Sequence, residues 1–184
     1  MASSNGKPRK IDFFFDIMCP WAYQTSIWIR EVRSQIDLEI NWKFFSLEEI
    51  NREEGKKHPW EREIAYGWTP LRIAAWLRRI DVDLCDDWYL AAAKALHEDG
   101  LRPYEEATAR ELLASIAAPE NTWDEALADK TTHDDVRRDH EESVNKFCIR
   151  CAADCVRKRS KCFWSVCCAA TARRGGNETM ATDE

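Results

Sequence analysis

Cys19 is the residue of this chain best suited to covalent chemistry, because it directly precedes Pro20, Trp21 and Ala22. Proline is favoured at the first position of a helix, so the spacing predicts a helix that begins at Pro20 with Cys19 at its N-terminus. The helix dipole and the unpaired N–H groups there stabilise a thiolate, lowering the thiol pKa below its usual value of about 8.5. Trp21 would present a flat apolar surface to a substrate. The alternative is that Cys19 is only a small buried residue at the end of a strand.

The elements around Cys19 follow from the periodicity of the apolar residues. Residues 11–16 form a short aromatic run between polar residues, which is typical of a buried strand. Residues 38–45 alternate apolar and polar side chains, and this period of two predicts a second strand. A helix over residues 20–34 would connect them. The segment is therefore predicted to be a β-α-β unit, in which a right-handed crossover makes the strands parallel.

Beyond Ser46 the apolar residues recur with a helical period over most of the remaining chain. Pro103 and Pro119 are typical of later helix starts. The predicted helices lie near residues 73–80, 88–96, 104–117, 120–130 and 134–146. The predicted organisation is a β-α-β unit at 10–50, a helical insertion at 51–132, a returning helix at 133–147 and a cysteine-rich tail at 148–184.

The overall composition narrows the classes of partner. The chain has 184 residues, 45% of them hydrophobic, which is enough for a folded core. Its net charge of -6 provides no basic surface for nucleic-acid phosphates. The N-terminal segment contains no apolar run, so we expect neither a secretory signal nor a membrane span. The expected setting is the cytoplasm, where structural disulfides are rare, with small molecules and proteins as partners.

Two stretches of sequence carry a family resemblance. They are Asp16-Ile17-Met18-Cys19-Pro20-Trp21-Ala22-Tyr23 and Trp28-Ile29-Arg30-Glu31-Val32. They resemble the DsbA-like oxidoreductases of actinobacterial type, which include mycothiol-dependent nitroreductases and are related to chromene-carboxylate isomerases and kappa-class glutathione transferases. The likeness continues through residues 46–51, 67–72 and 96–97 to the helix that ends near Phe147. It implies an α/β fold of thioredoxin-like type with an inserted helical domain.

The resemblance also implies roles for individual residues. Cys19, Pro20 and Trp21 would form the catalytic motif, in which the Cys19 thiol attacks in thiol-disulfide exchange. Asn51 and His97 would face the substrate. Position alone offers simpler interpretations of these two, with Asn51 as a turn or cap residue and His97 as a residue that interacts with a helix dipole.

Family members commonly have a second cysteine where this chain has Ala22. Without a thiol there, Cys19 cannot close the usual internal disulfide, so an external thiol or another cysteine must release any mixed disulfide. The remaining chemistry is a monothiol cycle with glutathione or mycothiol as co-substrate and no bound cofactor. The leading hypothesis is therefore a thiol-disulfide oxidoreductase that acts through one cysteine on small-molecule thiols or disulfides, or on protein thiols.

The last 37 residues differ in composition from the rest of the chain. They contain six of the eight cysteines and carry a net charge of +3, against -9 for the first 147 residues. No proline follows Pro119, so the chain lacks the Val-Pro-Thr type of loop that the resemblance leads us to expect soon after Phe147. Clear strand patterns are also missing. We therefore expect the C-terminal strands to be missing or replaced and the tail to be poorly ordered.

Two interpretations compete for this cysteine-rich tail. Cys148 and Cys151 have the spacing of zinc ligands, with Cys155 and Cys162 as further thiolates, but the tail has no second pair with this spacing and no histidine. We favour a tail that is not the family's own C-terminus, for example after a shift of reading frame, and expect no metal site. The rival functions are a glutathione- or mycothiol-dependent transferase or isomerase, a truncated inactive domain, and a zinc-binding module.

Overall fold

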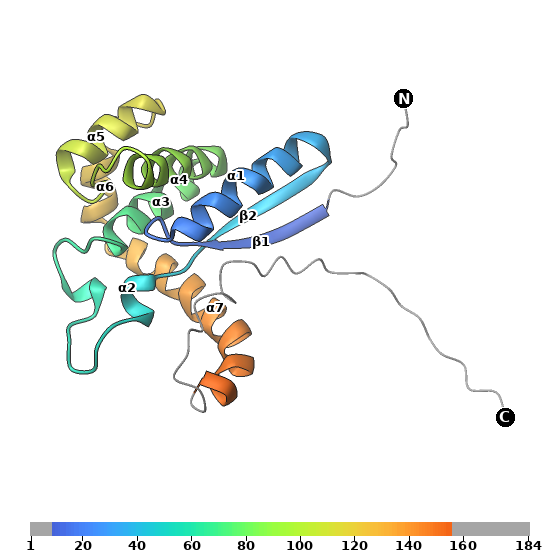
Figure 1. The fold of residues 1–184 in the computed structure, drawn as a ribbon. Coiled ribbons are helices and arrows are strands. Elements are labelled where there is room, and N and C mark those ends of the chain that lie inside the picture. The colour runs from blue at the N-terminus through green and yellow to red at the C-terminus, as the bar shows by residue number, and fades with distance from the viewer. Residues whose placement is uncertain (1–8, 156–184) are drawn as a thin grey trace.

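The N-terminal part of the chain is a β-α-β unit, as its periodicity predicts. A computed structural model describes residues 9–155, with side chains for residues 9–146. The first three elements are strand β1 (Arg9–Phe15), helix α1 (Pro20–Gln35) and strand β2 (Leu38–Phe44). The strands pair in parallel, with Phe15 opposite Phe44. In Figure 1, α1 lies along both strands. A short turn connects the end of β1 to the start of α1.

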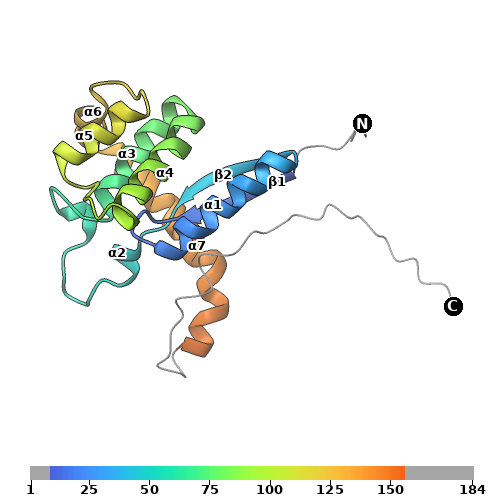
Figure 2. The same cartoon turned by 45° about the horizontal axis from the view of Figure 1, so that its top comes forward.

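Helices make up most of the remaining described chain. They are α2 (Leu47–Ile50), the 3-10 helix η1 (Pro59–Glu61), α3 (Trp68–Ile80), α4 (Val82–His97), α5 (Glu106–Ser115), α6 (Thr122–Ala128) and α7 (Thr131–Cys155). The longer helices lie where the helical period predicts them, but α7 continues past its predicted end at Lys146. The short elements α2 and η1 were not predicted, because one turn is too short to show a period. In Figures 1 and 2, α3 to α6 gather at one end of the strands and α7 runs from this group past β2.

The two faces of the sheet are covered by different helices. Phe15 of β1 stacks on Tyr89 of α4, and Trp42 of β2 lies edge-on to both rings. On the opposite face, the Lys43 ammonium pairs with Glu142 of α7 at 2.5 Å. Alternate residues of each strand therefore face the α1 and α4 side or the α7 side, as the period of two requires.

A buried ion pair sets how α1 lies against α4. Arg30 Nε donates to Asp86 Oδ1 at 2.7 Å, and Arg33 pairs with the other oxygen of the same carboxylate at 2.9 Å. The Arg30 guanidinium also lies 4.7 Å from the centroid of the Trp42 ring. Because buried charges are tolerated only when they are paired, these contacts constrain the orientation of α1 and of the cysteine that precedes it.

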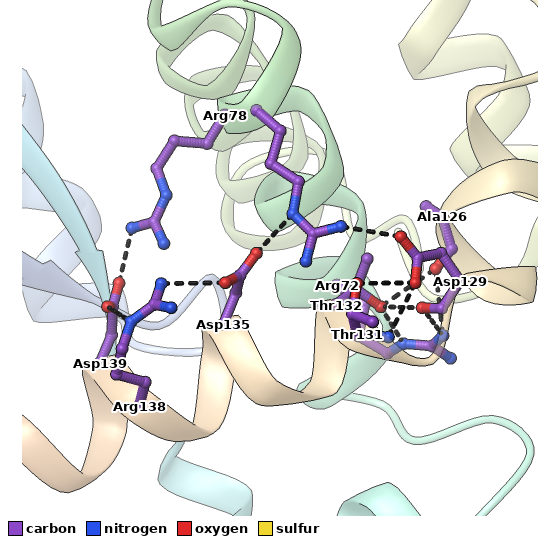
Figure 3. Close-up of polar contacts among 10 residues, drawn as sticks. Arg72, Arg78, Ala126, Asp129, Thr131, Thr132, Asp135, Arg138 and Asp139 are labelled. Carbon is purple, nitrogen blue, oxygen red and sulfur yellow. Dashed lines mark hydrogen bonds and ion pairs between the residues drawn. The ribbon is translucent and has the colours of Figure 1, made fainter.

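Arginines of α3 hold α7 near the carboxyl end of β2 (Figure 3). Arg78 donates to Asp139 Oδ2 at 2.6 Å. The same oxygen accepts the backbone N–H of Phe44 at 3.3 Å. Arg79 donates to Asp135 at 2.6 Å. The end of β2, helix α3 and helix α7 therefore meet at one polar junction. The same end of the strands carries Cys19.

Between residues 9 and 155, no helix is long and apolar enough to cross a membrane. The same residues form a single sheet of two strands. The predicted loss or replacement of C-terminal strands lies outside the described residues. The tail cysteines are also outside the described side chains: Cys148, Cys151, Cys155, Cys162, Cys167 and Cys168.

Candidate active site

Cys19 is the N-cap of α1, as its place before Pro20 predicts. Its backbone is extended (φ -90°, ψ 109°), and its Sγ accepts the backbone N–H of Ala22 at 3.4 Å. The first turn of α1 contains no acidic side chain. The sulfur therefore takes the place of a capping oxygen at the positive end of a helix, which favours the thiolate. Cys19 is only 1% exposed, whereas Pro20 and Trp21 beside it are exposed.

A tight turn connects β1 to Cys19. The N–H of Cys19 donates to the carbonyl O of Asp16 at 3.0 Å, which closes the turn. Within it, the N–H of Met18 donates to Asp16 Oδ1 at 2.8 Å. Aspartate commonly makes such contacts with the backbone two residues on. Asp16 therefore shapes the turn that places Cys19 at the start of the helix.

Asp16 is a second titratable group of the site, to which the sequence pattern assigned no role. Burial raises the pKa of its carboxyl to about 7, opposed by two backbone N–H donors and reinforced by the negative charges of Cys19 and Glu48. A carboxylate and a thiolate in one buried site destabilise each other. Asp16 is therefore coupled to the ionisation of Cys19. The available signal was a charged residue between the apolar Phe15 and Ile17.

The start of α2 is tied to the same carboxylate. The N–H of Leu47 donates to Asp16 Oδ2 at 2.5 Å, and the N–H of Ser46 donates to His140 Nδ1 of α7 at 3.2 Å. Burial lowers the pKa of His140 to about 4, so its ring is neutral at neutral pH and can accept this hydrogen bond. The segment after β2 therefore connects α7 to the turn before Cys19.

Glu48 is buried next to this segment and caps another helix. Its Oε2 accepts the N–H groups of Gly67 and Trp68 at the start of α3, at 3.0 and 3.1 Å. Its Oε1 pairs with Arg62 at 2.5 Å. A Cβ at Gly67 would lie 3.3 Å from both Glu48 Oε2 and Met18 Cγ, so glycine permits the close approach of α3 to the turn. Glu48 therefore has a structural role that no local pattern reveals.

His97 reaches the turn from the end of α4. Its Nε2 lies 2.9 Å from the carbonyl O of Ile17, two residues before Cys19. Its ring stacks on Tyr23 with the centroids 5.5 Å apart, and the hydroxyl of Tyr23 donates to Glu98 at 2.5 Å. The structure thus brings His97 to the Cys19 turn, where its described hydrogen bond is to the backbone. Contact of His97 with a substrate stays a prediction.

The other two residues predicted beside the substrate differ in their surroundings. Trp21 follows the Cys19-Pro20 pair and is 52% exposed. Asn51 is exposed at the end of α2, where its amide donates to the carbonyl O of Leu47 at 2.8 Å. This contact supports the interpretation of Asn51 as a cap residue. A role of Trp21 or Asn51 in substrate binding stays a prediction.

Cys85 is the second cysteine whose side chain is described, and it belongs to the core. It lies in the first turn of α4, where burial raises the pKa of its thiol to about 12. Among the side chains that the structure describes, no group of three or more His, Cys, Asp and Glu residues could hold a metal ion. The zinc interpretation concerns tail cysteines outside this part of the chain.

Comparison with known proteins gives a family match. The model of the Rv2466c-like family, described as mycothiol-dependent nitroreductase Rv2466c, matches residues 18–180, which includes most of the cysteine-rich tail. The uncharacterized protein Rv2286c of Mycobacterium tuberculosis is 54% identical over 134 residues. That match covers 73% of this chain and 58% of the relative, so the chain spans little more than half of that protein's length.

Solved structures share the fold at low sequence identity. The thiol-disulfide exchange protein α-DsbA2 from Wolbachia pipientis matches with a TM-score of 0.54 and 11% identity, over 78% of this chain and 66% of that chain. The cytosolic disulfide reductase DsbM from Pseudomonas aeruginosa matches with a TM-score of 0.53 and 14% identity, over 74% and 78% of the two chains. These likenesses confirm the predicted α/β, DsbA-like thioredoxin fold with a helical insertion.

Proposed function

This chain belongs to the Rv2466c-like family of mycothiol-dependent nitroreductases, and from that premise we propose a thiol-disulfide oxidoreductase whose reacting group is Cys19. The observation that carries the proposal is the place of the Cys19 Sγ as the N-cap of α1, 3.4 Å from the backbone N of Ala22. A sulfur in this place accepts a helix N–H and lies at the positive end of the helix dipole. The thiolate, which is the nucleophile of thiol-disulfide exchange, is therefore favoured.

The reaction begins when the Cys19 thiolate attacks one sulfur of a disulfide. A bond forms between Cys19 Sγ and that sulfur, the substrate disulfide breaks, and the second sulfur leaves as a thiolate that is protonated from solvent. Asp16 retains its proton below a pH of about 7, which keeps a second negative charge away from the reacting thiolate.

Release of the mixed disulfide requires a thiol from outside the folded site. Ala22 stands where dithiol family members have a second cysteine, and Cys85 is fully buried with its pKa raised to about 12. With neither of these two positions able to supply the thiol, an external thiolate attacks the sulfur bound to Cys19, forming a new disulfide and returning Cys19 to its thiolate. The net reaction exchanges one thiol for another in the substrate disulfide.

The family description supports mycothiol as the external thiol, with glutathione as the alternative. DsbM from Pseudomonas aeruginosa, which shares the fold, has been solved with GSH. Trp21, which is 52% exposed next to the thiol, would pack against the small-molecule thiol or disulfide, and Asn51 and His97 are further candidate contacts. Protein thiols are a second class of substrate. Because the cycle requires a supply of reduced thiol, we place the protein in the cytoplasm, where thiols are kept reduced. The proposal includes no nucleic-acid or membrane partner.

The burial of Cys19 favours one alternative function. At 1% exposure, the residue offers little access to a bulky disulfide. In a mycothiol- or glutathione-dependent transferase or isomerase, Cys19 would orient the thiol of the co-substrate by hydrogen bonding and would form no covalent bond. The missing second thiol at Ala22 is compatible with this function as well.

Trapping of a mixed disulfide separates these functions. The full chain is incubated with oxidised mycothiol and, in parallel, with oxidised glutathione, then quenched with acid and analysed by peptide mass spectrometry. We expect an adduct on Cys19 that added mycothiol removes and that a Cys19→Ser variant cannot form. A folded chain whose Cys19 stays unmodified would contradict the oxidoreductase, and retained isomerase or transferase turnover would then favour the alternative. Zinc bound by the tail, or adducts on tail cysteines alone, would favour a zinc module or an inactive domain.

A further inference from the structure

The end of α4 contacts the chain on both sides of Cys19. His97 Nε2 lies 2.9 Å from the carbonyl O of Ile17, which comes two residues before the cysteine. The next residue, Glu98, accepts a hydrogen bond from the hydroxyl of Tyr23, which comes four residues after the cysteine. We call these two contacts the α4 clamp. The clamp joins the helical group to the turn before α1 and to the first turn of α1.

The chemistry of the atoms fixes the direction of the His97 hydrogen bond. A carbonyl oxygen can only accept, so Nε2 of His97 carries the hydrogen, in the neutral ring and in the cation alike. Ile17 is completely buried. Loss of the donor would therefore remove a hydrogen bond from a buried carbonyl and destabilise this conformation of the turn.

The conformation of the turn from Asp16 to Cys19 determines where the sulfur of Cys19 lies. The backbone N–H of Cys19 donates a hydrogen bond to the carbonyl O of Asp16 at 3.0 Å. The Sγ of Cys19 lies 3.4 Å from the backbone N of Ala22. Ile17 lies inside this turn, so rotation of the peptide that follows it would move Cys19 relative to the helix N–H groups. The orientation of the Ile17 carbonyl is therefore coupled to the stabilisation of the thiolate.

We propose that His97 is a positioning residue, which holds the Ile17 carbonyl and thereby keeps the Cys19 sulfur at the N-terminus of α1. The inference rests on the proposed function of Cys19 as the reacting thiol. It assigns His97 a role that acts through the backbone and is separate from the predicted contact with substrate. Tyr23 and Glu98 hold the other side of the clamp and keep α1 in register with α4.

The test compares substitutions of His97 that separate the hydrogen bond from the ring. His97→Phe keeps an aromatic ring against Tyr23 but lacks the donor, whereas His97→Gln provides an amide N–H at a similar reach. In the full chain, the rate of iodoacetamide alkylation of each cysteine is measured by peptide mass spectrometry from about pH 5 to about pH 9. At about pH 6 we expect His97→Phe to slow Cys19 roughly tenfold, equivalent to a rise of one pKa unit, and His97→Gln to restore most of the rate.

Cys85 provides an internal control for folding. Its thiol is fully buried, so it stays unreactive for as long as the core is intact. If His97→Phe exposes Cys85, the comparison of His97→Gln with His97→Asn replaces it, because asparagine is too short to reach the Ile17 carbonyl. Asp16, Tyr23 and Glu98, the other titratable groups at the turn and in the clamp, are unchanged in every variant.

The outcomes distinguish this inference from the proposed function. If Cys85 stays protected in the His97→Phe variant and Cys19 is alkylated at the native rate, the role of His97 is overturned while the proposed function stands. Equal rates of Cys19 alkylation in the glutamine and asparagine variants would have the same consequence. A native chain in which Cys19 titrates like an ordinary thiol would overturn the proposed function, and the role of His97 with it.

Discussion

Cys19 and Cys85 are both buried, and both lie at or near the start of a 16-residue helix, but only Cys19 caps its helix. At α1 the sulfur is itself the cap and accepts the N–H of Ala22 at 3.4 Å. At α4 the carboxylate of Asp81 is the cap and accepts the N–H of Asp83 at 2.9 Å, while Cys85 lies about one turn further on, within the core.

This difference shows that burial alone does not decide the chemistry of a thiol. Burial raises the pKa of Cys85 to about 12, and although Arg78 opposes this, Asp86 and Asp139 reinforce it. At Cys19 the helix N–H groups and dipole act on the sulfur directly and offset part of the cost of desolvation. We therefore expect the same residue type to be inert in α4 and nucleophilic at the start of α1.

The largest effect is expected when each cysteine is replaced separately. Cys19→Ser abolishes adduct formation with oxidised mycothiol, because no thiolate remains at the cap. Cys85→Ala keeps the rate within about twofold of the native rate, because the buried thiol takes no part in the exchange. Both rates are measured by mass spectrometry of quenched samples, with circular dichroism to confirm folding. A folded Cys85→Ala variant that forms no adduct on Cys19 would break the comparison.

A second thiol in the first turn of α1 is the next largest change. Ala22→Cys places a thiol next to the N–H that the Cys19 sulfur already accepts, so we expect an internal disulfide to close and the mixed disulfide no longer to accumulate. The fraction of chain held as mixed disulfide is measured by intact mass. Ser26→Cys, buried one turn further along α1, is the matched control and leaves this fraction unchanged. Equal accumulation in both variants would show that Cys19 does not face the first turn.

Two exposed tryptophans on α1 allow a smaller, matched test of the substrate side. Trp21 is 52% exposed beside the thiol, and Trp28 is 61% exposed further along the same helix. We expect Trp21→Ala to raise the KM for mycothiol by up to roughly tenfold through lost packing, and Trp28→Ala to change it by less than about twofold. Steady-state kinetics in which mycothiol is varied measure both. Equal effects would place the thiol co-substrate elsewhere.

The smallest expected effect comes from the charge of Asp16. Because burial raises the pKa of this carboxyl to about 7, it is neutral below that pH and opposes the Cys19 thiolate above it. Asp16→Asn should therefore speed the alkylation of Cys19 roughly two- to fivefold above pH 7 and leave it nearly unchanged well below pH 7. Asp12→Asn, four residues earlier in strand β1, is the control. A uniform change at every pH would indicate that only the turn geometry was altered.

Whether a residue of the site could be predicted depends on how far along the sequence its partners lie. The N-cap position of Cys19 was predictable, because the preference of Pro20 for a helix start is a local property. Asp16 and Glu48 were missed, because their partners lie 31 and 19 residues away, at Leu47 and Gly67. No periodicity within one element can reveal such contacts.

His97 and Asn51, whose roles the family resemblance implies, show that a motif does not specify contacts either. Resemblance selected His97 and Asn51, but it could not predict that their described hydrogen bonds would be to backbone carbonyls, those of Ile17 and Leu47. A motif identifies which residues matter to a family, whereas the packing of α4 and α2 decides which atoms they reach. Their contact with a substrate stays a prediction.

The sequence by itself determined the β-α-β order, the helix start after Cys19 and the absence of a second thiol at Ala22, because each depends on neighbouring residues alone. Only the tertiary structure decided that burial raises the pKa of Asp16 to about 7, that His97 donates to the Ile17 carbonyl, and that Cys85 is enclosed by the core. Desolvation and long-range hydrogen bonds arise when separate elements pack together. The pattern of one segment therefore cannot specify them.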